Sequence, residues 1–395
     1  MKKIKHVFKL ILRVKFIFKT PEKNDLVIFD KVSVRDLSVC LSKINFFVLQ
    51  TRIESIDEIY LSYKILKKIL INCFKGNLLT AYLISLIELI KPKVVITTID
   101  NSFKFSEVAK VLEKKINFIA IQNASRENFL EEKELFYNKK YYIPNFFCFG
   151  DHERILYNYL GVRVKTFYPI GSLRFANFLY QTRTEKNSYE KYNSDICLAP
   201  TFTEFKNREE GHAKIVKYTI KFCIRNNMKL ICVGKRDKKI HPIHYKNEID
   251  FFRRNLSKEE FDYLQKNFLE KNTDNFTSFR SVLKSKVTVG SGSTLLKDKL
   301  CTGGKILSCN LTDTNAWNFP IKGICSLNHC TFEAFEKRLL EIYAISKENF
   351  FFKIDKKPDY VMRFSKNCST IDLIREKLSQ LGVHQNSITN NSFEM

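Results

Sequence analysis

Short apolar segments alternate with amphipathic segments along this chain, and the alternation occurs in two separate runs. In the first run the pattern predicts helices at 103–115 and 151–160 and two more within 54–90. We expect strands at residues 25–30, 44–49, 91–100, 116–122 and 145–150. Strands that alternate with helices form parallel βαβ units, so this run predicts a parallel sheet covered by helices.

A second run of the same kind follows a polar stretch at 181–194 that has little to bury. Its predicted strands are 195–199, 228–234, 287–290 and 305–309. Its predicted helices are 209–226, 258–268, 277–284 and 331–345, and a last helix at about 369–381 could pack back on the first half.

The length of the chain, 395 residues, exceeds what one hydrophobic core usually serves. We therefore predict an α/β protein in which two Rossmann-like domains face a cleft. The expected division is a basic amphipathic segment at 1–20, an N-terminal domain at 21–180, a linker at 181–194, a C-terminal domain at 195–383 and a disordered tail at 384–395.

The charge is strongly basic, with 67 Lys and Arg against 42 Asp and Glu and a formal net charge of +25. Such an excess favours an anionic partner: nucleic acid, membrane lipid or a phosphorylated substrate. An AT-rich coding sequence would also enrich Lys, Asn, Ile and Phe. The chain lacks a recognisable nucleic-acid-binding module, so nucleic acid is not the expected partner.

The 11 cysteines are scattered, without CxxC or Cys/His metal spacing, which favours a reducing cytoplasm. No stretch has about 18 uninterrupted apolar residues, as a transmembrane helix would need. Residues 1–20 mix bulky apolar side chains with basic ones and contain no acid. This segment fits either an anchor lying on the anionic inner membrane or the first element of the fold.

The stretch 287–300 predicts a buried strand, a Gly/Ser loop and the first turn of a helix. Glycines allow close backbone approach to a ligand, and hydroxyl side chains favour the start of a helix. Unpaired amides at such a start attract phosphate, and an ordinary strand-to-helix turn is the alternative. The candidate ligand-binding residues here are Gly290, Ser291, Gly292, Ser293 and Thr294.

A basic loop at 234–244 follows the strand 228–234. Lys235, Arg236 and His241 can donate hydrogen bonds to phosphate oxygens, and Pro242 restricts the backbone of His241. A solvated basic loop is the alternative. Asp298, in the helix after the Gly/Ser loop, could accept from ribose hydroxyls or only favour the start of that helix.

In the first half, polar residues follow two predicted strands at the edge that should face the cleft. Asp100 is the candidate general base for an acceptor hydroxyl, although it could equally cap the next helix. Asn101, Gln122 and Asn123 are candidate acceptor-binding residues. Arg126 and Arg174 could hold an anionic acceptor or the contact between the domains. In the second half, the loop 200–204, with Glu204, could line the cleft or form a turn.

Several kinds of site are not indicated by these residues. No convincing metal cluster and no Ser-His-Asp arrangement can be inferred. The glycines are not followed by Gly-Lys-Ser/Thr, so the P-loop pattern is absent, and a full GxGxxG is missing, which disfavours a nicotinamide enzyme.

Four segments together resemble bacterial surface-carbohydrate biosynthesis proteins of the two-Rossmann (GT-B) glycosyltransferase type, closest to capsule and O-antigen assembly proteins. The segments are 94–101 (VVITTIDN), 119–123 (IAIQN), 290–294 (GSGST) and 319–326 (FPIKGICS). The His241-Pro242 pair and the Ser/Thr cluster also resemble those of CMP- and CDP-dependent sialyl-, Kdo- and glycerophosphotransferases. The resemblance implies that His241, Ser291, Ser293 and Thr294 bind the donor phosphate.

The sequence and the resemblance together predict a metal-independent glycosyltransferase of bacterial surface polysaccharide biosynthesis. Asp100 and His241 would be its catalytic residues, with no cofactor and with a CMP- or CDP-linked sugar as donor substrate. The donor would bind the C-terminal domain, and a glycan or lipid-linked acceptor the N-terminal domain. We expect a cytoplasmic protein at the periphery of the inner membrane. The alternatives are a non-catalytic glycan-binding assembly protein and a polyol-phosphate transferase.

Overall fold

The structure is a computed structural model, and it describes residues 13–52, 55–126, 130–183, 193–201, 206–270, 276–365 and 368–384. Four sequence predictions therefore fall wholly or partly outside the described residues. They concern residues 1–12 of the basic segment, residues 184–192 of the linker, Glu204, and residues 385–395 of the tail.

The N-terminal half contains a six-stranded sheet whose strands all pair in parallel. Its spatial order is β3 (Phe47–Leu49), β2 (Leu26–Phe29), β5 (Val94–Thr97), β6 (Asn117–Ile121), β7 (Tyr142–Cys148) and β8 (Arg163–Pro169). Strands β2 and β5 are buried along their whole length, as a parallel sheet covered on both faces requires. The chain adds β3 on one side of β2 and then β5 on the other side, so the direction in which strands are added to the sheet reverses between β2 and β5.

The C-terminal half contains a second six-stranded parallel sheet. Its order is β11 (Phe268–Leu269), β10 (Leu230–Val233), β9 (Ser194–Ala199), β12 (Ser285–Gly290), β13 (Lys305–Asn310) and β14 (Ser326–Asn328). Counted within this half, the order is 3-2-1-4-5-6, which is that of dinucleotide-binding Rossmann domains. The direction reverses between β9 and β12, and ligands of such sheets bind at this point.

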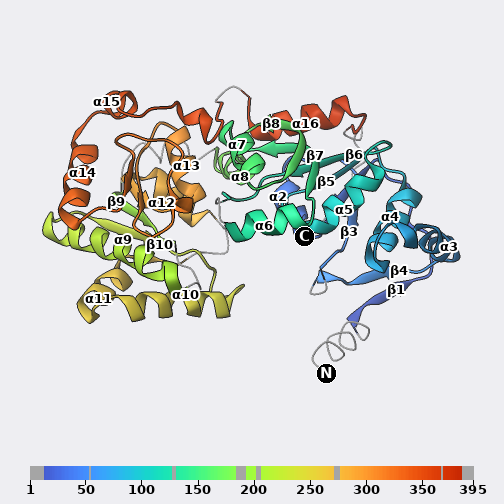
Figure 1. Ribbon diagram of the computed structural model, residues 1–395, viewed down its shortest axis with the longest axis horizontal. Coiled ribbons are helices and arrows are strands. Elements are labelled where there is room, and N and C mark those ends of the chain that lie inside the picture. Colours follow the sequence, from blue (N-terminus) through green and yellow to red (C-terminus); the bar gives the residue numbers. More distant parts are fainter. Residues whose placement is uncertain are drawn as a thin grey trace.

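Helices cover both sheets, which lie in the two halves seen in Figure 1. In the N-terminal half they are α2 (Ser33–Leu37), α3 (Tyr63–Asn72), α4 (Leu78–Ile90), α5 (Phe103–Leu112), α6 (Leu130–Asn138), α7 (His152–Tyr159) and α8 (Leu173–Gln181). In the C-terminal half they are α9 (Lys206–Arg225), α10 (Pro242–Asn255), α11 (Lys258–Lys266), α12 (Thr277–Leu283), α13 (Thr294–Cys301), α14 (Phe332–Ala344) and α15 (Lys347–Phe352). The predicted α/β fold with two Rossmann-like sheets is confirmed.

The last helix, α16 (Thr370–Gln380), returns to the N-terminal half, as the sequence predicted (Figure 1). Its buried residues Ile371, Ile374 and Leu378 join the core that contains β2 and β5 residues. The Arg375 guanidinium donates to the carbonyl oxygens of Val39 and Cys40. The chain thus crosses between the halves a second time, which ties them together.

A small parallel pair, β1 (Lys15–Ile17) and β4 (Glu58–Tyr60), lies beside helices α3 and α4 at the outer end of the N-terminal half (Figure 1). The sequence analysis placed helix from residue 54, but α3 begins only at Tyr63, where Ser62 caps it. The elements that were not predicted are strands β4, β8, β11 and β14 and helices α2, α6, α8, α10 and α15. In no described helix does an apolar run reach the length needed to cross a bilayer.

Candidate functional site

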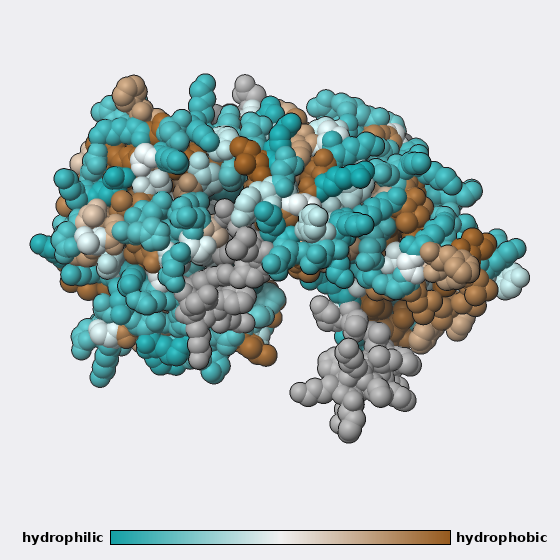
Figure 2. Space-filling view, viewed as in Figure 1, coloured by the Kyte–Doolittle hydropathy of each residue, from teal (hydrophilic) through white to brown (hydrophobic). Residues whose placement is uncertain are grey.

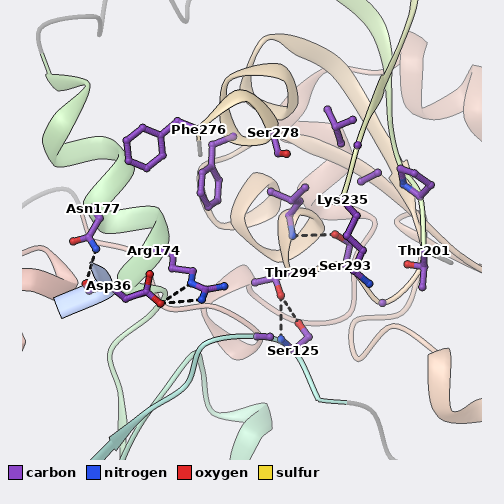
Figure 3. A pocket seen from close by; sticks show the side chains of 18 of the residues that line it. Asp36, Ser125, Arg174, Asn177, Thr201, Lys235, Phe276, Ser278, Ser293 and Thr294 are labelled. Atoms are coloured by element: carbon purple, nitrogen blue, oxygen red, sulfur yellow. Dashed lines mark hydrogen bonds and ion pairs between the residues drawn. The ribbon is translucent and has the colours of Figure 1, made fainter. Parts of the chain in front are cut away.

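A cavity of about 740 Å³ lies between the two halves, and the chain reversals of both sheets border it (Figure 3). From the C-terminal half, Pro200 and Thr201 follow β9, and Gly292 follows β12. From the N-terminal half, Arg35 and Asp36 lie in α2, directly after β2. The predicted cleft between two Rossmann-like domains is therefore present.

The Gly/Ser turn forms one wall of this cavity through Gly292, Ser293 and Thr294. Gly292 has a φ of +58°, which glycine adopts without strain. The Ser293 hydroxyl accepts from the backbone amide of Leu295 and so caps α13. Within the described residues, the backbone amides of Ser293 and Thr294 have no hydrogen-bond acceptor, so they remain available to an anion at the positive end of the helix.

Gly290 has a different role from the one predicted, because it does not line the cavity. A Cβ atom there would lie 2.6 Å from the carbonyl oxygen of Ala199, on the neighbouring strand β9. Glycine is thus required for close packing of β12 against β9. Ser291 also lies outside the lining, with its side chain buried, and its carbonyl oxygen accepts a hydrogen bond from the Thr201 hydroxyl.

Among the described residues that line the cavity, four carry a cationic side chain: Arg35, Arg126, Arg174 and Lys235. Lys235 is exposed and follows β10, and its backbone amide donates to the buried Glu248 carboxylate at 2.9 Å. Burial raises the pKa of Glu248, although hydrogen bonds from the amides of Lys235 and Arg236 oppose this shift. The excess of positive charge favours an anionic ligand.

Asp36 is the one acidic residue among the described residues that line the cavity, and the sequence analysis missed it. Both Nε and Nη2 of Arg174 lie 2.9 Å from Asp36 Oδ2 (Figure 3). The other oxygen, Oδ1, lies 3.8 Å from Arg35 Nε and accepts no hydrogen bond from a described residue. The rule that ligand groups follow strand ends would have found Asp36, because α2 follows the predicted strand at 25–30.

Aromatic side chains complete the lining. Phe276 precedes α12 and Phe279 lies within it, and both line the cavity on the side of α8 (Figure 3). The Phe279 ring stacks on the Phe178 ring of α8, with centroids 5.2 Å apart. Trp317 contributes from the opposite loop. Flat apolar walls of this kind suit a nucleobase or a sugar ring. No sequence motif singled out these three residues.

The two halves contact each other directly beside the Gly/Ser turn. The Ser125 backbone amide donates to the Thr294 hydroxyl at 3.0 Å. Lys297 Nζ lies 3.2 Å from Glu153 Oε1, and both side chains are buried. A second cavity of about 410 Å³ adjoins this contact and shares Ser125, Gly292 and Ser293 with the first.

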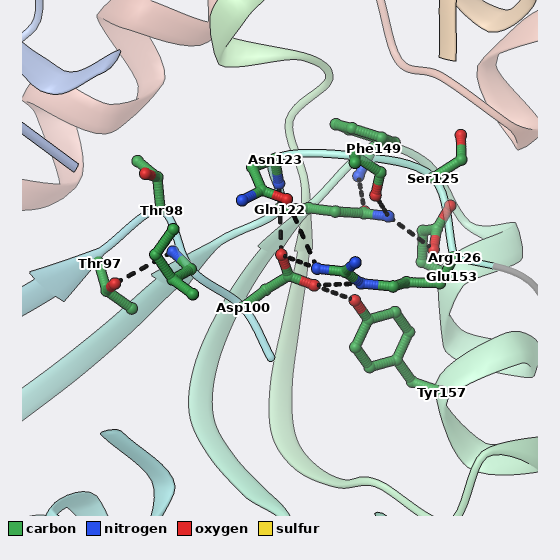
Figure 4. Close-up of polar contacts among 12 residues, drawn as sticks. Thr97, Thr98, Asp100, Gln122, Asn123, Ser125, Arg126, Phe149, Glu153 and Tyr157 are labelled. Carbon is green, nitrogen blue, oxygen red and sulfur yellow. Dashed lines mark hydrogen bonds and ion pairs between the residues drawn. The ribbon is translucent and has the colours of Figure 1, made fainter. Parts of the chain in front are cut away.

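Asp100 does not line either cavity, which corrects its prediction as a general base. Its carboxylate is enclosed and accepts from Nε and Nη2 of Arg126 at 3.0 and 2.7 Å, and from the Tyr157 hydroxyl at 2.5 Å (Figure 4). Burial would lower the pKa of Arg126, but the Asp100 charge outweighs it and raises that pKa. Burial also raises the pKa of Tyr157, to which the Asp100 charge adds. Asp100 thus serves as a counter-ion.

Of the four predicted acceptor-binding residues, one lines the cavities and three do not. Arg126 lines both cavities, whereas Asn101, Gln122 and Asn123 line neither. Gln122 is buried, and its amide nitrogen donates to Glu153 at 3.0 Å while its oxygen accepts from the Phe149 amide at 2.9 Å (Figure 4). Gln122 therefore positions the interdomain carboxylate.

His241 and Arg236, predicted to bind phosphate, do not line the cavity either. His241 is exposed at the N-cap of α10, a helix that the sequence analysis read as part of a basic loop. Pro242 occupies the first helical position, where its missing N–H has no cost. The His-Pro pair thus begins a helix.

Asp298 lies inside the fold rather than beside a ligand. Its side chain is buried, its Oδ1 has no hydrogen-bond partner among the described residues, and it does not line the cavity. Burial raises the pKa of Asp298 well above its ordinary value, although Lys297 opposes this. Asp298, predicted to contact a ribose, thus lies away from the cavity in this arrangement. No group of three or more His, Cys, Asp or Glu side chains in the described ranges could hold a metal ion.

Comparisons with known proteins add only distant likenesses. No protein-family model and no curated protein matches the chain. Similar solved structures include a glycosyltransferase from Rickettsia africae, with 11% identity and a TM-score of 0.46 over 93% of this chain and 100% of that one. A wall teichoic acid polymerase has 9% identity and a TM-score of 0.49 over 97% and 98% of the two chains. The UDP-GlcNAc 2-epimerase of Methanocaldococcus jannaschii has 13% identity and a TM-score of 0.47 over 90% and 99%. At these values the function must be argued from the site itself.

Proposed function

We propose that this protein is a glycosyltransferase that uses a nucleotide-activated sugar in the biosynthesis of a bacterial surface polysaccharide. The observation that carries the proposal is the turn at Gly292, Ser293 and Thr294, whose free amides face a cavity lined by four cationic side chains. The amides of Ser293 and Thr294 and the ammonium of Lys235 would bind the phosphate groups of the donor. Following the sequence resemblance, we propose a CMP- or CDP-linked donor.

The transfer itself requires that an acceptor hydroxyl lose its proton. In our proposal the acceptor oxygen bonds to the anomeric carbon, the bond from that carbon to the donor phosphate breaks, and the nucleotide leaves with the electron pair. The proton passes to Asp36, which takes over the role predicted for Asp100. Amides and cations around the departing phosphate would stabilise its charge without a metal ion.

The acceptor would enter from the N-terminal half, where Arg35, Arg126 and Arg174 gather. This charge suits an acidic glycan or a phosphate-linked lipid carrier at the cytoplasmic face of the inner membrane. A second candidate function is binding of an anionic glycan without transfer. It is favoured by the pairing of Asp36 with Arg174, which occupies the Oδ2 oxygen of the carboxylate that would accept the proton.

A thermal-shift panel of CMP, CDP, UDP and GDP tests the proposal. We expect at least one nucleotide to raise the Tm, because a ligand that binds only the folded state stabilises it. If no nucleotide raises the Tm while an acidic glycan does, glycan binding without transfer is the function. If neither does, the assignment of an anionic ligand to this cavity is wrong.

A further inference from the structure

The most concentrated apolar surface of the described residues lies far from the cavity, over α3, the start of α4 and strand β1 (Figure 2). Its exposed fractions are 93% for Phe74, 80% for Tyr63, 72% for Leu78 and 71% for Leu70. We call it the hairpin patch, defined by the exposed side chains of Phe16, Phe18, Tyr63, Leu66, Leu70, Ile71, Phe74, Leu78 and Leu79.

The helical repeat explains why these side chains project to solvent. Leu66 and Leu70 are spaced four residues apart and share one side of α3, and Phe74 follows at the same spacing in the 3₁₀ turn Cys73–Lys75. The opposite side of α3 is buried through Ile65 and Asn72, and Asn72 Nδ2 donates to the Ser85 hydroxyl of α4 at 3.1 Å. The inner face of α3 thus packs against α4. Its outer face is apolar, whereas the outer face of a helix exposed to water is normally polar.

Strand β1 is fastened to the same surface. It pairs with β4, and the Thr20 hydroxyl lies 3.0 Å from that of Ser62, the N-cap of α3. Phe16 and Phe18 therefore extend the apolar surface formed by the α3–α4 helical hairpin. The patch therefore belongs to the part of the N-terminal half that the structure describes.

The segments that form the patch carry positive charges only. The ranges 13–19 and 63–79 contain Lys and Arg but no Asp or Glu. Lys68 and Lys75 pair with Glu88, whereas Lys64 and Lys67 form no ion pair within the described chain. Apolar side chains rimmed by unneutralised lysines fit a surface that offers both hydrocarbon and negative charge.

We propose that the hairpin patch docks this protein on the surface of an anionic lipid bilayer. Aromatic and aliphatic side chains would enter the headgroup boundary, and the lysines would contact lipid phosphates. A second copy of the chain fits less well, because a two-fold contact through this patch would bring Lys64 and Lys67 of both copies together. The inference is independent of the reaction proposed for the cavity.

Co-sedimentation of the full chain with vesicles tests this inference. We expect binding to vesicles that contain phosphatidylglycerol and at least tenfold weaker binding to pure phosphatidylcholine. The double variant Leu70→Ser with Phe74→Ser should bind phosphatidylglycerol vesicles at least tenfold more weakly, since it removes two exposed apolar side chains. Lys64→Gln with Lys67→Gln should weaken binding by about fivefold per lysine and remove most of the salt dependence.

A matched control lies on the C-terminal half. Phe352 and Ile243 are exposed to 88% and 73%, and Phe352→Ser with Ile243→Ser should leave vesicle binding unchanged. Equal losses in the control and the patch variants would overturn the proposal, as would absence of vesicle binding by the unaltered chain. Self-association that disappears in the patch variants, without vesicle binding, would assign the patch to a second copy instead. Donor binding in the cavity should be the same in all variants.

Discussion

Lys297 of the C-terminal half forms an ion pair with Glu153 of the N-terminal half, at 3.2 Å, with side chains only 6% and 0% exposed. Glu153 Oε2 also accepts from Gln122 Nε2. The pair joins α13, which begins at the Gly/Ser turn, to α7. The ion pair therefore fixes the positions of the two cavity walls relative to each other.

Breaking this pair should destabilise the protein strongly. Glu153→Gln or Lys297→Met alone should lower the free energy of unfolding by about 3–5 kcal/mol, because each leaves a buried charge without its partner. The double variant should lose less than the sum of the two. Urea titration measures the effect, with Lys246→Met as control. The exposed Lys246–Asp250 pair should contribute less than about 1 kcal/mol. A loss below 1 kcal/mol in both single variants would show that the halves do not depend on this contact.

Asp100 should behave as a counter-ion. We expect Asp100→Asn to lower the free energy of unfolding by about 3 kcal/mol, since the largely buried Arg126, whose side chain is 14% exposed, would keep its charge without an opposing carboxylate. Thermal and urea unfolding of this variant measure the loss. A variant that is as stable as the unaltered protein but inactive in transfer would restore the role of general base.

Asp298 should make stability depend on pH. Burial raises its folded-state pKa, so above pH 3.8 the folded protein retains a proton that the unfolded chain releases. Stability then falls as the pH rises from 3.8 towards the raised pKa, by up to about 1.4 kcal/mol per pH unit. Asp298→Asn removes this dependence.

Urea midpoints of both proteins at pH 4, 5, 6 and 7 check the prediction. The difference in stability should move in favour of Asp298→Asn as the pH rises from 4, for as long as the pH stays below the raised pKa. Nucleotide affinity should not change, because Asp298 is enclosed away from the cavity. Parallel pH curves would contradict the raised pKa of Asp298, and a loss of nucleotide affinity would support the ribose contact predicted from the sequence.

Asp36 should be needed for transfer and not for donor binding. Asp36→Asn retains an oxygen for the Arg174 hydrogen bonds but cannot accept the acceptor proton. We expect kcat to fall about 10²–10⁴-fold, with the Kd of the nucleotide within about twofold. Turnover is followed as nucleotide released from the donor sugar that the ligand panel selects. An unchanged kcat would remove Asp36 from the mechanism.

The periodicity of the chain was sufficient to predict the fold class, because buried parallel strands such as 94–97 are uniformly apolar. The same pattern, with the glycines and serines, also predicted the strand, turn and helix at residues 287–300. Strand β8 escaped prediction because its first half mixes Arg163, Lys165 and Thr166 with one apolar residue, and because it is an edge strand that pairs, within the described residues, with β7 alone.

The site was predicted less well, because residue type does not show which side chains a fold encloses. Asp100 and Asp298 have the chemistry of a base and a ribose ligand, but tertiary packing buries both. His241 lies away from the cavity for a local reason. Pro242 favours the first turn of a helix, which makes His241 the N-cap of α10. Asp36, Phe279 and Trp317 come together only through packing between the halves, which no local pattern encodes.

The central claim is that phosphate binds at the turn formed by Gly292, Ser293 and Thr294. Ser293→Asp and Ser293→Asn test it most directly, because both residues cap a helix as well as serine does, and only one adds a negative charge. Isothermal titration with the nucleotide selected by the panel gives the Kd of each variant. We predict that Ser293→Asn binds within about fivefold of the unaltered protein, and that Ser293→Asp binds at least about 100-fold more weakly, through the loss of roughly 3 kcal/mol. Equal affinity in the two variants would contradict the account.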